Sequence, residues 1–303
     1  MLSLFVNILL PVFLVAALGA LLDHWMRFDP APLTWLSLYL FSPALVFSSI
    51  VHSTLALTDV AAIVGFVFAL TFALVVVGYA VTRVSRLDGT ARNAFLLSVV
   101  LINAGNFGLP VMLLALGQPG LERGVIFFVA TNVVANSIGV FLARQGLGPS
   151  REAFTNIFRI PPIYAIVLGL AVRLSGISLP DALLKPIELL GNAAIPMLLV
   201  ILGIRLRRVR LSASVRWIGL ASGLRLLVAP ALAIVLASLF RMEGLTRQVV
   251  ILQSSMPTAV FATVLAIRFD VDSDIVAGTI AVSTLVSALT LTGWMWVLGV
   301  RPG

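Results

Sequence analysis

Long apolar runs, separated by short connections that carry arginine, dominate the 303-residue sequence. Their approximate ranges are 3–22, 33–53, 60–82, 93–117, 124–143, 160–175, 184–204, 213–240, 246–267 and 275–298. Most runs have the ~20 residues that a helix needs to cross a bilayer. They are apolar on all sides and lack the two-residue alternation of a membrane β-barrel. The sequence therefore predicts an all-α polytopic membrane protein with about ten transmembrane helices.

The composition agrees with a lipid environment, because 60% of the residues are hydrophobic and only 11% are charged. A soluble domain carries about a quarter charged residues. The net charge of +8 comes from arginines between the apolar runs, and Lys185 is the single lysine. These arginines are interpreted as topology signals, so no nucleic-acid partner is expected. The first run lacks a basic leader and exceeds the 7–15 residues of a signal-peptide core, so we expect it to be a retained span.

Alternate connections between the predicted spans are rich in arginine. These connections contain Arg27; Arg83, Arg86 and Arg92; Arg144, Arg151 and Arg159; Arg205, Arg207, Arg208, Arg210 and Arg216; and Arg268. Positively charged loops remain on the cytoplasmic side of a membrane. We therefore predict a protein of the cell (inner) membrane with both termini on the outer side.

Three pairs of prolines recur in the same order, about 150 residues apart, as expected of an internal repeat. The pairs are Pro11 with Pro161, Pro43 with Pro196, and Pro110 with Pro257. We interpret residues 1–143 and 160–303 as two five-helix repeats, joined by a short cytoplasmic connection at 144–159. An odd number of spans inverts the second repeat relative to the first, as in many secondary transporters. The alternative is a coincidence, because membrane helices tolerate proline.

The fourth apolar run is interrupted at its centre by polar and helix-breaking residues. Residues 101–110 read LINAGNFGLP, with two asparagines, two glycines and Pro110. The ninth run contains a counterpart, Gln253-Ser-Ser-Met-Pro257-Thr258. Proline and glycine weaken a helix, and unwound backbone at membrane depth is tolerated only beside protein or a polar cavity. Matched interruptions in two inverted halves indicate a transporter binding site; the alternative is a pair of kinks whose amides join helices.

A break in a membrane helix exposes backbone groups that can bind a ligand. Pro110 and Pro257 are each expected in the first turn of the following half-helix, whose free N–H groups favour an anion. The preceding carbonyls, with side-chain amides, provide a cage for a substrate or a hard cation, and no metal or cofactor is required. The predicted substrate-binding residues are Asn103, Asn106, Pro110, Gln253, Ser254, Ser255, Pro257, Thr258 and Arg225.

Polar residues in two other runs are further candidates. Asn132 and Asn136 are four residues apart, on one helix face, where they line the cavity or ion site or else form interhelical hydrogen bonds. Arg225 lies well inside the eighth run. It is expected to attract a carboxylate, to cap half-helix carbonyls, or to extend toward the membrane surface.

Chemistry that needs acids or thiols inside the membrane is absent from the sequence. No Asp or Glu falls at the centre of an apolar run, and the chain has no cysteine and no HExxH motif. An intramembrane enzyme is therefore not expected. If transport is coupled to sodium or protons, neutral oxygens must bind the ion or the substrate must carry the proton. A sensor or partner-binding protein is another alternative, but no appended soluble domain supports it.

The 103–110 motif NAGNFGLP, together with the 253–258 motif and the ten-span layout, resembles the auxin efflux carrier family, whose prokaryotic members include malonate- and malate-type permeases. The resemblance implies a fold like that of bile-acid symporters, in which spans 1, 2, 6 and 7 form a scaffold. Spans 3–5 and 8–10 then form a transport domain that moves as an elevator, often within a homodimer. It also implies that the fourth and ninth spans cross at their breaks, with Asn103, Asn106, Pro110, Gln253 and Pro257 at the crossing.

The short 144–159 connection replaces the long central loop of plant hormone exporters, which makes auxin itself a poor specific substrate. We predict a secondary transporter for a small organic anion, a mono- or dicarboxylate of malonate, malate or auxin type. The alternative is a sodium-coupled symporter of a neutral or sterol-like solute.

Overall fold

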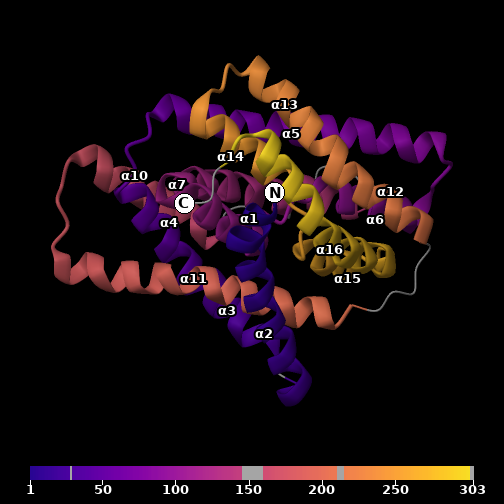
Figure 1. Ribbon diagram of the computed structural model, residues 1–303, viewed down its shortest axis with the longest axis horizontal. Helices are drawn as coiled ribbons and strands as arrows, with labels where there is room; N and C mark the ends of the chain where they lie inside the picture. The colour runs from indigo at the N-terminus through magenta and orange to yellow at the C-terminus, as the bar shows by residue number, and fades with distance from the viewer. Residues whose placement is uncertain (28, 145–159, 210–214, 301–303) are drawn as a thin grey trace.

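The computed structural model describes residues 1–27, 29–144, 160–209 and 215–300 (Figure 1). The described residues form helices without a β-strand, and one isolated β-bridge joins Ile102 to Thr258. Seven helices among them are long and apolar enough to cross a membrane. The all-helical prediction is therefore confirmed for this part of the chain, whereas the ten-span inverted repeat stays a prediction. All but the first residue of the predicted connection 144–159 lies outside the described residues.

Each of the first two predicted spans is a continuous helix with a π-helical turn. The first contains α1 (Leu2–Leu4), η1 (Phe5–Leu9) and α2 (Leu10–Met26), and the second contains α3 (Pro30–Leu36), η2 (Ser37–Phe41) and α4 (Ser42–Val51).

The third to fifth predicted spans contain α5 (Leu57–Val84), α6 (Gly89–Val100), η3 (Ala104–Gly108), α7 (Leu109–Val134), η4 (Ala135–Gly139) and α8 (Val140–Ala143). Within α7, Gly117 has a φ of 65°, a left-handed conformation that glycine adopts without strain. This bend separates the fourth predicted span from the fifth.

The second half contains α10 (Pro161–Ser175), α11 (Asp181–Arg207), α12 (Val215–Gly223), η5 (Leu224–Val228), α13 (Ala229–Leu239), α14 (Gly244–Ser254), α15 (Phe261–Arg268) and α16 (Ser273–Val297). The helices α14 and α15 are each too short to cross a bilayer, and residues 255–260 separate them.

Proline explains most of the π-helical turns. Among the five such turns in the described residues, four are followed by a proline at the second position after the turn. These prolines are Pro11, Pro43, Pro110 and Pro230. A proline ring clashes with the carbonyl four residues earlier, and that carbonyl belongs to the π-turn in each case. The wider turn accommodates the ring without ending the helix.

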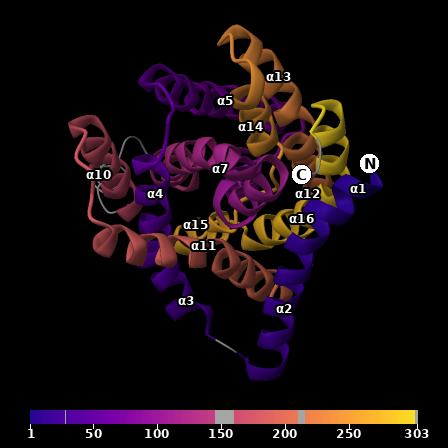
Figure 2. The same ribbon diagram turned by 60° about the vertical axis from the view of Figure 1, so that its left-hand side comes forward.

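The helices pack as two groups (Figures 1 and 2). The first group consists of α2, α3, α4, α10 and α11, and the second consists of α5, α6, α7 and the helices from α12 to α16. Both views place α5 and α13 on one side of the molecule and α3 and α11 on the opposite side, with α7 between them. The groups meet around η3 and α7, which contact α11 and α4.

Small residues let α2 and α11 approach closely within the first group. A Cβ atom added to Gly203 would lie 1.7 Å from the Ala16 carbonyl oxygen, and one added to Gly19 would lie 2.3 Å from the Val200 carbonyl oxygen. Side chains at these positions would separate the two backbones. Glycine is common at such contacts because packing, not hydrophobic burial, holds membrane helices together.

An ion-pair cluster joins the ends of the same two helices. Asp23 of α2 is buried, and its carboxylate accepts from Arg207 Nη1 at 2.7 Å and from Arg208 Nη2 at 2.5 Å. Arg207 is the last residue of α11 and Arg208 follows it, so two arginines expected to set topology also hold α2 against α11.

Candidate functional site

The two interrupted segments cross and pair through their backbones. The Asn103 N–H donates to the Pro257 carbonyl at 2.9 Å, and the Ala259 N–H donates to the Leu101 carbonyl at 2.9 Å. The isolated β-bridge lies between these two bonds. The breaks therefore satisfy each other's exposed backbone groups, which is the condition for non-helical backbone at membrane depth.

Pro110 lies in the first turn of α7, as expected, although the π-helical turn η3 precedes it, whereas Pro257 does not begin the following half-helix. Helical conformation resumes at Ala104, ahead of Pro110, and α15 begins at Phe261, beyond Pro257. The Pro257 carbonyl is instead used to pair with Asn103. The pairing of the two segments, rather than the local effect of each proline, sets where the helices stop and restart.

Arg225 caps the carbonyl ends of two half-helices. Its Nη1 donates to the Val99 carbonyl of α6 at 2.9 Å, and its Nη2 donates to the Ser254 carbonyl of α14. In unbroken helices Asn103 and Thr258 would donate to these carbonyls, but their N–H groups donate to the Pro257 carbonyl and to Ser283 Oγ at 3.2 Å. Each carbonyl is thus one that a break leaves open, at the negative end of a helix dipole. The capping alternative fits these contacts.

Gln253 packs into the crossing rather than into an open space. It is fully buried, and its Nε2 lies 3.5 Å from the Ala104 carbonyl oxygen. A Cβ atom at Gly108 would lie 2.2 Å from Gln253 Oε1, so the glycine makes room for this amide. Gln253 thus connects the end of α14 to the first turn after the other break.

The hydroxyl residues of the second motif are also fully buried. Ser254 Oγ and Ser255 Oγ donate to carbonyls one turn earlier in α14, at 2.6 and 2.8 Å. Thr258 Oγ1 donates to the Ser98 carbonyl of α6 at 2.7 Å. These hydroxyls satisfy backbone acceptors of the crossing.

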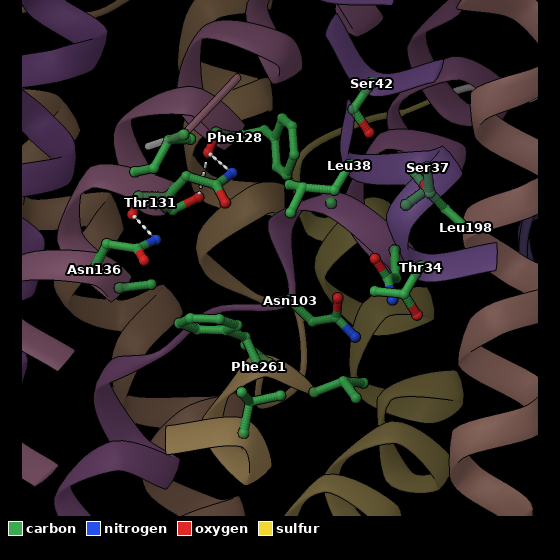
Figure 3. Close-up of a pocket in the computed structure, with 18 of the residues that line it drawn as sticks. Thr34, Ser37, Leu38, Ser42, Asn103, Phe128, Thr131, Asn136, Leu198 and Phe261 are labelled. Carbon is green, nitrogen blue, oxygen red and sulfur yellow. Dashed lines mark hydrogen bonds between the residues drawn. The ribbon is translucent and has the colours of Figure 1, made fainter. Parts of the chain in front are cut away.

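A cavity of about 490 Å³ lies beside the crossing, between the two packing groups (Figure 3). This volume is within the 300–1,000 Å³ of typical ligand pockets. Its polar and charged lining residues are Thr34, Ser37, Tyr39, Ser42, Asn103, Asn106, Thr131, Asn132, Asn136, Arg205 and Arg268. The described lining includes two arginines and no acidic residue.

The structure divides the predicted site residues into two sets. The four asparagines Asn103, Asn106, Asn132 and Asn136 line the cavity. The remaining predicted residues are buried in or beside the crossing and do not line the cavity. They are Pro110, Arg225, Gln253, Ser254, Ser255, Pro257 and Thr258. Asparagine at the first break therefore faces the cavity, whereas the polar groups of the second break support the crossing.

Asn132 and Asn136 lie on the cavity face of α7 and η4. Asn132 Nδ2 donates to the Phe128 carbonyl at 2.9 Å, and Asn136 Nδ2 donates to the Asn132 carbonyl at 3.0 Å (Figure 3). Each amide thus donates to its own helix one turn earlier. These contacts fit the cavity-lining alternative.

Arg205 and Arg268 were not among the predicted site residues. Both lie near a helix end that the sequence predicts to face the cytoplasm, where arginine is expected as a topology signal. Arg205 is half-buried and donates from Nη2 to Thr34 Oγ1 at 3.1 Å, and its Nε is buried without a partner. Arg268 is exposed at the end of α15. The sequence offers no cue that separates Arg205 from Arg207 and Arg208, which follow it closely in the same arginine-rich stretch.

The described residues include no group of three or more His, Asp or Glu side chains that would hold a metal ion. The donors around the cavity are amides, hydroxyls and guanidinium groups, which bind oxygen acceptors.

Membrane-length helices, two crossing broken segments and a partly open cavity with amide, hydroxyl and guanidinium groups in its lining are features of a membrane transporter. The chain matches the model of the family described as "Membrane transport protein" over residues 4–156 and 150–295. It belongs to this auxin efflux carrier-like family, as its motifs predict. The protein is therefore an integral membrane protein of a transporter family.

Two archaeal proteins named uncharacterized transporters are similar to the chain. The protein from Methanothermobacter thermautotrophicus is 31% identical over 258 residues, which cover 84% of this chain and 85% of the relative. The protein from Methanocaldococcus jannaschii is 29% identical over 223 residues, which cover 71% of each chain.

Proposed function

We propose that the protein is a secondary transporter, not an enzyme, and that it moves a small organic anion, a mono- or dicarboxylate of malonate, malate or auxin type. The observation that supports an anion is the cavity lining, in which asparagine amides, hydroxyls and two arginines occur with no acidic residue among the described positions. A guanidinium group binds a carboxylate through charge-assisted hydrogen bonds.

The proposed mechanism is elevator-type alternating access in a chain of two inverted repeats, 1–143 and 160–303, in which a transport domain of predicted spans 3–5 and 8–10 moves against a scaffold of spans 1, 2, 6 and 7. The packing supports this division, because the first group contains predicted spans 1, 2, 6 and 7 and the second contains spans 3–5 and 8–10. The cavity lies between these groups, where a relative movement would change its access. We further propose a homodimer in the cell membrane, with both termini outside, on the basis of the family resemblance and the arginine distribution.

A sodium or proton coupling ion is part of the proposal, and the alternative is a sodium-coupled symporter of a neutral or sterol-like solute. A sodium site needs free oxygen ligands. At the crossing the carbonyls of Ser98, Val99, Leu101, Ser254 and Pro257 each accept a hydrogen bond from a protein group, whereas the side-chain oxygen Gln253 Oε1 is buried without a partner.

Uptake of labelled malonate or malate into proteoliposomes tests the function. The variant Asn106→Ala, which removes an amide from the cavity lining, should lower uptake at least about tenfold, the loss of one hydrogen bond to a charged ligand. Asn192→Ala is the matched control, because Asn192 is exposed on α11 and does not line the cavity. Sodium-dependent uptake of uncharged solutes, without carboxylate uptake by the wild-type protein, would contradict the proposal.

A further inference from the structure

We propose that the structure represents the inward-open state, in which the cavity continues toward the cytoplasm through a second, smaller pocket, and that Arg205 guides anions along this passage. The inference goes beyond the proposed function, because it assigns a route and a side of access that the function does not specify. It starts from the positions that the lining residues occupy along their helices.

The residues that line the cavity lie between the crossing and the arginine-rich helix ends. On α11 they begin at Leu198 and end at Arg205, in the half of the helix that leads to the arginine-rich connection. On the second predicted span they fall within 34–42, the half that follows the connection containing Arg27. Because the arginine-rich connections are predicted to be cytoplasmic, the cavity lies in the inner half of the protein. The described residues of the outer halves contribute no lining residue at 43–53, 110–127 or 181–197.

A second pocket of about 330 Å³ continues from the cavity toward the same side. Arg205 and Val260 line both spaces, so the two are neighbours that share a wall. Val260 belongs to the segment between α14 and α15, at the crossing, whereas Arg208 follows the end of α11. Together the two pockets lead from the crossing to the arginine-rich side. The lining of the second pocket consists of Arg205, Arg208, Val209, Val260, Thr263, Ile267, Ser273, Asp274, Ala277 and Ile280.

On the opposite side of the crossing the two packing groups close against each other. The helix α4 of the first group contacts α7 of the second (Figure 2). At the outer end of these helices, the Glu122 carboxyl of α7 interacts with the Ser53 hydroxyl and lies near the His52 imidazole, and both partners follow α4. Protein therefore fills the described outer approach to the crossing, whereas the inner approach contains two pockets.

Arg205 has the contacts of a group that can receive an anion in the passage. It is half-buried, its Nη2 donates to Thr34 Oγ1 at 3.1 Å, and its Nε is buried without a partner. No carboxylate of the described residues forms an ion pair with it, whereas Asp23 pairs with both Arg207 and Arg208. A guanidinium group that no acid neutralises attracts a passing carboxylate through charge-assisted hydrogen bonds.

The passage as a whole carries the same sign of charge. Its described lining contains three arginines, Arg205, Arg208 and Arg268, against one acid, Asp274. A narrow space lined by one sign of charge raises the local concentration of ions of the opposite sign. The inner mouth is therefore expected to admit anions faster than neutral or cationic solutes.

Sided thiol labelling tests the passage, because the chain has no cysteine and each introduced thiol is the only one. Thr263→Cys places a thiol in the second pocket, and Asn136→Cys places one in the cavity. The reagent is an anionic, membrane-impermeant methanethiosulfonate, and its adduct is measured on the protein purified afterwards. Both thiols should react at least about tenfold faster in inside-out vesicles than in intact cells, because a minor, outward-open state holds about 10% of the molecules or less.

Two further thiols complete the design. Ser178→Cys lies in the exposed connection between α10 and α11, which is predicted to be outside, and should react only in intact cells. Ile267→Cys is a second position in the second pocket and replaces Thr263→Cys if that variant does not fold. A thermal melt shows whether each variant folds.

The role of Arg205 is tested in the Asn136→Cys protein. Adding Arg205→Gln should slow the anionic reagent about tenfold, at the low end of the effect that a charged cleft has on association rates. Neutral methyl methanethiosulfonate should react as fast as before or faster, and Arg205→Lys should retain the fast anionic reaction. Lys185→Gln is the control, because it removes a positive charge at the far, exposed end of the same helix.

Each outcome bears on one part of the inference. Equal labelling of the two pocket thiols from both sides, or faster labelling in intact cells, would overturn the inward-open assignment. Labelling of Ser178→Cys only in inside-out vesicles would overturn the cytoplasmic direction, and an unchanged anionic rate in folded Arg205→Gln would overturn the guiding role. These measurements need no transport substrate, so a wild-type protein that takes up no carboxylate would overturn the proposed function while the passage stands.

Discussion

Replacing Arg225 by methionine tests whether this arginine stabilises the crossing or binds substrate. Methionine keeps most of the aliphatic length of the side chain but donates no hydrogen bond. A buried ion pair can be replaced by apolar residues without loss when both partners change. That compensation is impossible here, because the partners of Arg225 are the backbone carbonyls of Val99 and Ser254.

The expected loss follows from these two acceptors. Each buried carbonyl that loses its donor costs about 1–3 kcal/mol, so Arg225→Met should lower the free energy of unfolding by about 2–6 kcal/mol. The apparent melting temperature of the purified protein should then fall by at least about 4 °C, on the scale of small soluble domains. Arg225→Lys should give a smaller loss, because one ammonium group replaces the planar fork that reaches both carbonyls.

Thermal melts in detergent, combined with substrate affinity of the folded fraction, provide the assay. Arg216→Met is the matched control, because Arg216 lies on the preceding helix α12 but is exposed. It should melt like the wild-type protein. An Arg225→Met protein that retains its melting temperature but loses substrate affinity would refute the capping role and return Arg225 to the substrate site.

Three further variants test the packing. Gly108→Ala should displace the Gln253 amide and lower both the melting temperature and transport, measured on the same preparation, and unchanged melting would show that the crossing tolerates the methyl group. Gly203→Ala should separate α2 from α11, because its Cβ would clash with the Ala16 carbonyl; normal yield and melting of this variant would argue against the close contact. Asp23→Asn should lower the melting temperature by weakening two ion pairs with arginines at the end of α11, and a melt identical to wild type would assign those arginines to topology alone.

The positions of the long helices could be predicted because a segment that lies in lipid must consist mostly of apolar residues. The run 60–82 corresponds to α5, which extends from Leu57 to Val84. The observed helix is longer because Asp59 and Arg83 interrupt the apolar run without interrupting the helix. Charged side chains near a helix end can reach the polar surface while the backbone stays helical.

The exact site of the first break was not predictable from its own motif. The polar motif 101–110 located the interruption, but the backbone leaves the helix at Leu101, well before Pro110. The deciding interaction is the hydrogen bond from Asn103 to Pro257, which joins residues that are distant in the sequence. The helix propensities of residues 101–110 do not indicate which distant segment they will pair with.

Cavity residues could be predicted where a polar side chain interrupts an apolar run, but not where it belongs to an arginine-rich connection. Asn103, Asn106, Asn132 and Asn136 are conspicuous in apolar runs, and all four line the cavity. Arg205 was grouped with the topology arginines, because its role depends on the position of α11 beside α3 and its contact with Thr34. Only the tertiary structure distinguishes it from its neighbours.

The contacts of Arg225 also have a consequence for biogenesis. A residue of the second half caps α6, which belongs to the first half, and also caps α14. Ribosomes synthesise the first half before residue 225 exists, so Arg225 cannot cap the end of α6 while the first half enters the membrane. The first half is thus expected to wait in an incomplete state, and to mature only when the second half is inserted beside it.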